Sequence, residues 1–144
     1  MDYNKYVSVN LNWNGNKVIE KANNNIDKVL IQDCGLIEAK AKRDVNKDTT
    51  RLASSITREI KLSNGASFGS EMGSKAKEQD KIKQSEIKGE GIVGTNVEYA
   101  ETVEEKVKAY LRPAYDYYEP KIKSDFEKAI KDAIKWLKNI LVIN

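Results

Sequence analysis

Histidine is absent from this sequence, and cysteine occurs only once, at Cys34. Without histidine the chain lacks the commonest general base near neutral pH and the commonest metal ligand of proteins. Zinc sites built from cysteine and histidine are therefore excluded, whereas carboxylate sites for Mg²⁺ or Ca²⁺ are not. A single cysteine cannot form an intrachain disulfide, which suits a reducing cytoplasm. These absences favour a protein that is not an enzyme and needs no cofactor.

Long hydrophobic runs are also missing. The longest spans residues 140–143, far short of the ~20 apolar residues that cross a bilayer. Residues 1–13 are polar and alternating, and they lack the apolar segment of a signal peptide. We therefore expect no membrane partner.

Charge is plentiful but evenly mixed. The chain carries 25 Lys and Arg against 22 Asp and Glu, which leaves a net charge of +3. Such a mixture guarantees no large field of one sign, so composition gives only weak support to nucleic-acid binding. The length of 144 residues fits one domain, residues 1–144, with a single core.

Hydrophobic periodicity predicts the first two elements. Residues 7–13 alternate apolar and polar side chains, which indicates a half-buried strand that Asn14-Gly15 ends. From about residue 17 to residue 43, apolar residues recur every three or four positions, which predicts one long helix. Its stripe consists of Val18, Ala22, Ile26, Val29, Leu30, Ile37 and Ala41.

The remaining elements complete the predicted fold. Residues 54–62 and 92–97 are expected to be strands, and residues 98–107 a short helix. Residues 111–114 are expected to form a turn in which Pro113 is well placed to begin a helix. A last helix is expected from about Pro120 to Leu141, with an apolar stripe of Ile122, Phe126, Ile130, Ile134, Leu137 and Leu141. We predict an α+β fold in which a small antiparallel sheet packs against two long helices.

The segment from residue 66 to residue 90 differs from the rest because it is rich in Gly, Ser, Lys and Glu. Its larger apolar residues are Phe68, Met72, Ile82 and Ile87. Structureless loops this long are uncommon unless they are functional or disordered. We expect a long projecting loop, either an arm that orders on assembly or a hairpin in which Phe68 and Met72 face Ile82 and Ile87.

Three groups of residues have side chains suited to chemistry. Ser54-Ser55 lacks a histidine to activate it. The carboxylates of Glu98, Glu101, Glu104 and Glu105 are more typical of a solvated, ion-paired face than of a Mg²⁺ site. The lysine-rich last helix indicates a charged outer face, with nucleic-acid binding as the alternative.

Seven tyrosines make the chain unusually rich in a residue that is enriched at protein interfaces. Tyr115, Tyr117 and Tyr118 cannot all enter one small core, so at least one should face solvent or a partner. The residues predicted to lie at a protein interface are Phe68, Met72, Ile82, Ile87, Tyr99, Glu104, Tyr110, Arg112, Tyr115 and Tyr117.

Three short motifs occur in a characteristic order: DTTRLASSI at residues 48–56, VEYAETVE at 97–104 and LRPA at 111–114. Together they resemble the neck or tail-completion proteins of long-tailed bacteriophages and prophages, also called head–tail connector or minor structural proteins. Thr50 and Glu105 stand where that family usually has glycine. The resemblance covers most of the chain except residues 66–90.

This resemblance implies a non-enzymatic structural protein of the virion, assembled in the cytoplasm of the bacterial host. Copies of the chain would form an oligomeric ring at the neck or tail top and help to join tail to head. The implied partners are the chain itself and neighbouring neck, connector or tail proteins, with passing contact with genomic DNA. A tail terminator of the same virion region and a nucleic-acid-binding module remain as alternatives.

Overall fold

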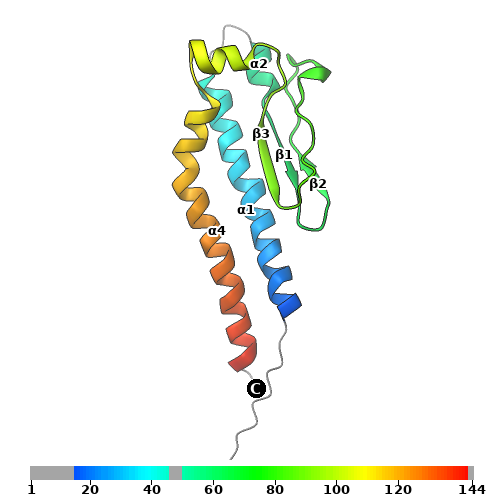
Figure 1. Ribbon diagram of the computed structural model, residues 1–144, viewed down its shortest axis with the longest axis vertical. Helices are drawn as coiled ribbons and strands as arrows, with labels where there is room; N and C mark the ends of the chain where they lie inside the picture. Colours follow the sequence, from blue (N-terminus) through cyan, green and yellow to red (C-terminus); the bar gives the residue numbers. More distant parts are fainter. Residues whose placement is uncertain (1–14, 46–49, 143–144) are drawn as a thin grey trace, which may run out of the picture.

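The computed structural model describes residues 15–45 and 50–142 (Figure 1). The strand predicted at residues 7–13 lies outside the described residues. Within them, no helix is both long and apolar enough to cross a membrane.

Two long helices dominate the fold. Helix α1 (Gly15–Asp44) confirms the helix predicted at residues 17–43, and helix α4 (Leu111–Val142) lies antiparallel beside it (Figure 1). The two helices meet closely where the side-chain amide of Asn25 donates a hydrogen bond to the carbonyl oxygen of Ala129, at 3.1 Å. Small residues make this approach possible, since Ala129 and Ala133, one turn apart, are buried.

The sheet has three antiparallel strands in the order β2-β1-β3, which are β1 (Thr57–Lys61), β2 (Ser67–Gly69) and β3 (Glu90–Gly94). Strand β1 begins later than predicted because residues 50–55 form the short helix α2 (Thr50–Ser55). The β1–β2 connection includes Gly65, whose φ of 90° is a conformation that glycine adopts without strain.

The predicted fold class is confirmed: the protein is α+β, with α1 and α4 packed against a small antiparallel sheet. One core cluster joins Ile37, Leu52, Ile56 and Tyr110, and Ile122 of α4 packs against it. The second joins Leu30, Cys34 and Ile60, with Phe126 of α4 packed against it. Both long helices therefore contribute to the same apolar interior.

Helix α4 begins at Leu111. The predicted turn at residues 111–114, with Pro113 placed to begin a helix, is the first turn of α4, and the prediction that the last helix starts near Pro120 was wrong. Pro113 lies in the first turn, where a missing N–H is harmless. Pro120 lies inside the helix, where an interior proline typically costs about 3 kcal/mol. Burial of Ala114 and packing of Ile122 against the core offset that cost.

Residues 66–90 form a long and mostly irregular loop, but the hairpin suggested for it is wrong. Phe68 pairs with Ile60 of β1, not with residues 82–87. The rest of the loop, including the 3₁₀ turn η2 (Glu78–Asp80), packs on the outer face of the sheet. Thr57 and Glu59 point to that face and are nevertheless buried, and Lys81 Nζ lies 3.4 Å from Glu59 Oε1.

The predicted short helix at residues 98–107 is present as two pieces. Helix α3 (Ala100–Thr102) continues into the π-helical turn η3 (Val103–Val107). This pair of turns carries the chain across one end of the molecule from β3 to the start of α4 (Figure 1).

Candidate interaction site

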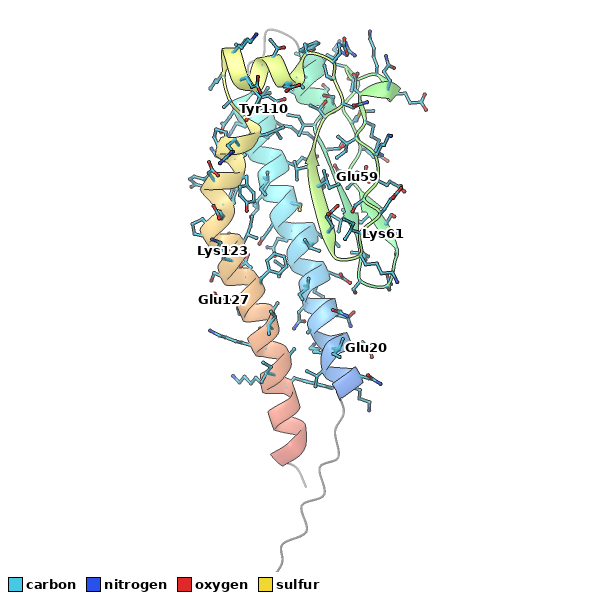
Figure 2. All side chains as sticks on the ribbon, viewed as in Figure 1. Glu20, Glu59, Lys61, Tyr110, Lys123 and Glu127 are labelled. Carbon is cyan, nitrogen blue, oxygen red and sulfur yellow. The ribbon has the colours of Figure 1, made fainter. Side chains whose placement is uncertain are left out.

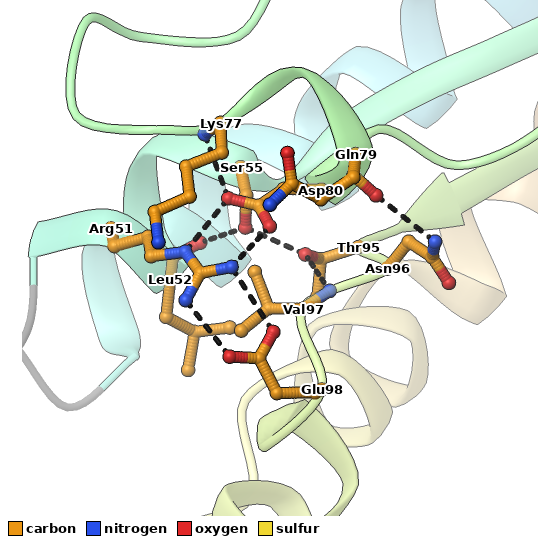
Figure 3. Close-up of polar contacts among 10 residues, drawn as sticks. All are labelled: Arg51, Leu52, Ser55, Lys77, Gln79, Asp80, Thr95, Asn96, Val97 and Glu98. Carbon is orange, nitrogen blue, oxygen red and sulfur yellow. Dashed lines mark hydrogen bonds and ion pairs between the residues drawn. The ribbon is translucent and has the colours of Figure 1, made fainter.

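Helix α2 lies at one end of the molecule (Figure 1), and Arg51 on this helix connects two distant parts of the chain (Figure 3). Its Nε and Nη2 atoms donate to the two carboxylate oxygens of Asp80, at 2.9 and 2.6 Å. Its Nη1 and Nη2 atoms also donate to Glu98, at 2.9 and 3.0 Å. We call Arg51, Asp80 and Glu98 the Arg51 cluster. This fork-shaped pairing fixes both the loop and the segment that follows β3.

The two carboxylates of the Arg51 cluster differ in exposure. Asp80 is fully buried, whereas the side chain of Glu98 is 70% exposed. The hydrogen bonds from Arg51 lower the pKa of both carboxyl groups, and those carboxylates raise the pKa of Arg51. All three groups are therefore charged at neutral pH. Of the two carboxylates, only that of Asp80 is buried, so its charge depends on the pairing with Arg51.

Hydroxyl groups extend this network. Ser55 Oγ donates to the carbonyl oxygen of Leu52 at 2.7 Å and lies 2.6 Å from Thr95 Oγ1 (Figure 3). Thr95 Oγ1 in turn accepts the backbone N–H of Val97, at 3.2 Å. Ser55 is fully buried. Its position favours a structural role over the nucleophile considered from the sequence.

Glu104 caps helix α4 from outside the helix. Its carboxylate accepts the backbone N–H groups of Tyr110 at 2.7 Å, Leu111 at 3.0 Å and Arg112 at 2.9 Å. These are amide groups that a helix start otherwise leaves without partners, and a negative charge there also suits the helix dipole. Glu104 therefore sets where α4 begins, a role that its spacing in the sequence did not reveal.

A cavity of about 470 Å³ lies between α1, β3 and the first turns of α4. We call it the groove. Leu30, Cys34 and Ile37 of α1 line it, together with Gly91 and Val93 of β3 and with Glu104, Leu111, Arg112, Tyr115 and Ile122. Gly91 is required here, because a Cβ at this position would lie 2.6 Å from Cys34 Sγ. Burial raises the pKa of Cys34 to about 11, so its thiol stays protonated at neutral pH.

The predicted interface residues do not form one surface. Ile87, Arg112, Tyr115 and Tyr117 are exposed, while Phe68, Met72, Ile82, Tyr99 and Glu104 are partly buried. The prediction for Tyr110 is wrong, because this side chain is fully buried in the core. Its burial raises the pKa of Tyr110 to about 12.

The first turns of α4 hold the most exposed of these aromatic residues. Tyr117 is 68% exposed and stacks edge-to-face on Tyr118, with ring centroids 4.9 Å apart. The ammonium group of Lys40 lies 4.9 Å from the centre of the Tyr117 ring, a cation–π contact with α1. Arg112 pairs with Asp116 across 3.6 Å on the same exposed surface.

The acidic residues near Glu98 do not converge. Glu98 pairs with Arg51, Glu104 caps α4, and Glu101 and Glu105 are exposed. Among the described residues, no group of three or more Cys, Asp or Glu is placed to hold a metal ion. The Mg²⁺ hypothesis therefore gains no support from the geometry.

Two features of the helices were not foreseen from the sequence. Ile130 and Ile134 were predicted to be core residues of α4, but they are 46% and 45% exposed, since Ala129 and Ala133 face α1 instead. Asp33 and Glu38 of α1 are buried carboxylates. The spacing of Ala129 and Ala133, four residues apart, was the signal in the sequence that this face of α4 packs on α1. No neighbouring residue in the sequence indicates that Asp33 and Glu38 are buried.

No protein-family model, curated protein or solved structure matches this chain.

Proposed function

We propose that this chain is a non-enzymatic structural subunit from the neck or tail top of a long-tailed bacteriophage or prophage. Its copies form a ring, and the ring helps to join tail to head. The proposal begins from the resemblance of residues 48–56, 97–104 and 111–114 to the neck and tail-completion proteins.

One observation carries the proposal furthest: the three motifs are in direct contact. Arg51 of the first motif is bonded to Glu98 of the second. Glu104 of the second motif accepts the N–H groups of Leu111 and Arg112 in the third. The first motif is far from the second in the sequence, and the second is close to the third, yet all three belong to one structural unit. This contact supports reading them as a single signature.

The exposed start of α4 supplies a contact surface for neighbouring subunits. Arg112, Tyr115 and Tyr117 project there from a helix that Glu104 holds in place. Tyrosine and arginine are among the residue types enriched at protein interfaces. This surface therefore fits a protein that acts through contacts with other proteins.

The oligomeric state tests the proposal. We expect size-exclusion chromatography with light scattering, run over a range of concentrations, to show a ring of several copies, alone or with purified portal and tail proteins. Tyr117→Ala should weaken that association, whereas Glu127→Ala, a control farther along the same helix, should not. A chain that stays monomeric and binds none of these proteins contradicts the proposal.

Nucleic-acid binding is the second candidate. Its supporting observation is that Lys128, Lys131 and Lys135 are exposed on α4. Lys121 and Lys123 support it less, because they pair with Asp125 and Glu119. Binding of duplex DNA at low salt that weakens steeply as salt rises would support this candidate, and the absence of binding at low salt would remove it.

A further inference from the structure

The groove presents a strand edge beside its apolar side chains. Arg58 of β1 accepts the backbone N–H of Ser70 at 3.0 Å, so the backbone groups of Arg58 point towards β2. Backbone groups of successive strand residues point to alternate sides, so those of the next residue, Glu59, point towards β3. There Glu59 pairs with Ile92. The backbone groups of Ile92 are therefore directed at β1.

Gly91 and Val93 flank Ile92 in β3 and direct their backbone N–H and C=O groups to the other edge of the strand. Both residues line the groove. Within the described part of the chain, β3 pairs with another strand only on its β1 side. The groove therefore combines an apolar floor with an open strand edge, and an occupant that fills it has to supply backbone N–H and C=O groups of its own.

The charge at the groove is positive and accessible. Arg112 lines the groove, its side chain is 82% exposed, and its Nε atom lies 3.6 Å from the exposed Asp116. The carboxylate of Glu104, which also lines the groove, already accepts three backbone N–H groups of α4. The groove thus fits an apolar side chain that has a carboxylate beside it, because the guanidinium fork of Arg112 pairs well with carboxylates.

One exposed apolar residue in the described part of the chain meets all of these requirements. Five of the exposed large apolar residues lie in long helices, whose backbone groups are already bonded: Ile19, Tyr115, Tyr117, Ile130 and Ile134. Ile92 belongs to β3 itself, and Val107 stands between two lysines. Ile87 is 63% exposed, lies outside helices and strands, and directly follows the exposed Glu86.

Ile87 is not placed to fill the groove of its own copy. Two residues later, Gly89 donates its N–H to the carbonyl oxygen of Lys61 at 2.8 Å, so this segment lies on the β1 side of β3. Figure 2 shows Lys61 towards the lower end of the sheet. The groove lies at the opposite edge of β3, next to Leu111 at the start of α4. Ile87 is therefore left to contact another molecule.

We propose that the groove of one copy receives Ile87 of a second copy. Glu86 of that second copy pairs with Arg112, and the backbone beside it meets the open edge at Gly91 and Val93. This inference rests on the proposed ring and names the contact that joins its neighbouring copies. The groove and the Ile87 segment are different surfaces, so the contact is heterologous, and repeated contacts of this type generate a ring when their rotation closes.

Self-association of single variants of the full chain tests the apolar part of the contact. Ile87→Ser should raise the dissociation constant between copies at least about tenfold, because the side chain that enters the groove is lost. The matched control is Val107→Ser, which removes an apolar side chain that is 57% exposed and should leave association unchanged. Sedimentation velocity over a dilution series measures both, and equal effects of the two variants would overturn the proposal.

Charge reversal tests the pairing of Glu86 with Arg112. Glu86→Lys and Arg112→Glu should each weaken association by about tenfold, whereas the chain that carries both exchanges should associate within about threefold of the natural chain. Recovery in the double variant also shows that the single variants are folded. A double variant that associates no better than either single variant contradicts the proposed pairing.

Mixing two defective variants separates this contact from the proposed function. Ile87→Ser copies keep a working groove, and Arg112→Glu copies keep a working Ile87 segment, so their mixture holds one competent contact. Native mass spectrometry should show pairs with one copy of each variant, which neither variant forms alone. Rings that persist in Ile87→Ser would overturn this contact and leave the proposed ring intact. A natural chain that stays monomeric and binds no virion protein would overturn both.

Discussion

Helix α1 buries one carboxylate against the sheet and another against α4, and the two differ in their hydrogen-bond partners. Glu38, on the sheet side, accepts hydrogen bonds from Arg58 Nη1 at 2.7 Å, Lys42 Nζ at 2.8 Å and Ser70 Oγ at 2.9 Å. Asp33, on the α4 side, has no hydrogen-bond partner for either oxygen among the described residues. Its nearest cation is Lys121, whose Nζ lies 3.5 Å away.

The pKa values of the two groups follow from these surroundings. Burial alone would raise the pKa of Glu38, but the hydrogen bonds from Lys42, Arg58 and Ser70 outweigh it and lower that pKa. For Asp33, burial raises the pKa from 3.8 to about 6, and the nearby Asp125 raises it further than Lys121 lowers it. Hydrogen bonds thus compensate the buried charge of Glu38 between α1 and the sheet, whereas the buried charge of Asp33 between α1 and α4 is not compensated.

The largest expected effect comes from breaking the satisfied contact. Arg58→Ala should lower the free energy of unfolding by about 3 kcal/mol, the low end of the range for removing one partner of a buried ion pair, because Lys42 and Ser70 still bond Glu38. Urea unfolding at neutral pH measures this change in the free energy of unfolding. The control Arg43→Ala removes an exposed ion pair with Asp44 and should change nothing measurable. Equal effects of the two variants would contradict the comparison.

Removing the uncompensated charge of Asp33 is expected to change the free energy of unfolding in the opposite direction. Asp33→Asn should raise the free energy of unfolding at pH 7 by about 1–3 kcal/mol, because one pKa unit corresponds to ~1.4 kcal/mol and the buried charge is removed. The folded protein holds the Asp33 proton more tightly than the unfolded chain does. The stability due to that proton is therefore fully present below about pH 3.8 and is lost as pH rises through about 6.

The pH dependence provides the check on Asp33. Unfolding measured from pH 4 to pH 7 should show a gap between Asp33→Asn and the natural chain that widens as pH rises. A gap that stays constant, or a variant that is less stable at pH 7, would show that Lys121 already compensates the charge. The exposed Asp116→Asn serves as a control without this pH dependence.

A smaller effect is expected at the start of α4. Glu104→Ala removes the acceptor for three backbone N–H groups and should lower the free energy of unfolding by about 1 kcal/mol, as for other lost helix caps. Glu105→Ala is the matched control, since Glu105 is exposed. Thermal unfolding followed by circular dichroism separates the two. A larger loss for Glu105→Ala would refute the assignment of Glu104 as the cap.

The smallest effect is expected in the Arg51 cluster at Glu98. Glu98→Gln should cause no measurable shift in thermal unfolding, because this carboxylate is 70% exposed and its pairing is screened by water. Asp80→Asn, which changes the buried partner of the same guanidinium, should destabilise the protein clearly. If both variants behave alike, exposure does not decide the value of these two ion pairs.

Local pattern accounts for much of the fold. The apolar residues spaced three or four apart specified α1, and Asn64-Gly65 specified the turn between β1 and β2. The candidate interaction site was foreseen only in part. Of the predicted interface residues, Arg112, Tyr115 and Tyr117 are exposed, whereas Tyr110 is buried in the core.

The failures share a physical cause. The last helix was predicted to start near Pro120, and proline disfavours helix interiors. The cap from Glu104 and the packing of Ala114 and Ile122 nevertheless begin the helix at Leu111. Likewise, the row of Ile130 and Ile134 suggested a core face, but Ala129 and Ala133 let α1 approach more closely. In both cases a contact distant in sequence outweighed a local preference.

The sequence alone determined the α+β fold class through its helical and strand periodicities, and it supplied the three motifs from which the proposed function starts. Tertiary structure alone decided that Arg51, Asp80 and Glu98 meet, that Glu104 caps α4, and that Glu38 is satisfied while Asp33 is not. The reason is that periodicity depends on neighbours along the chain. Ion pairing and burial depend on groups that folding brings together from far apart.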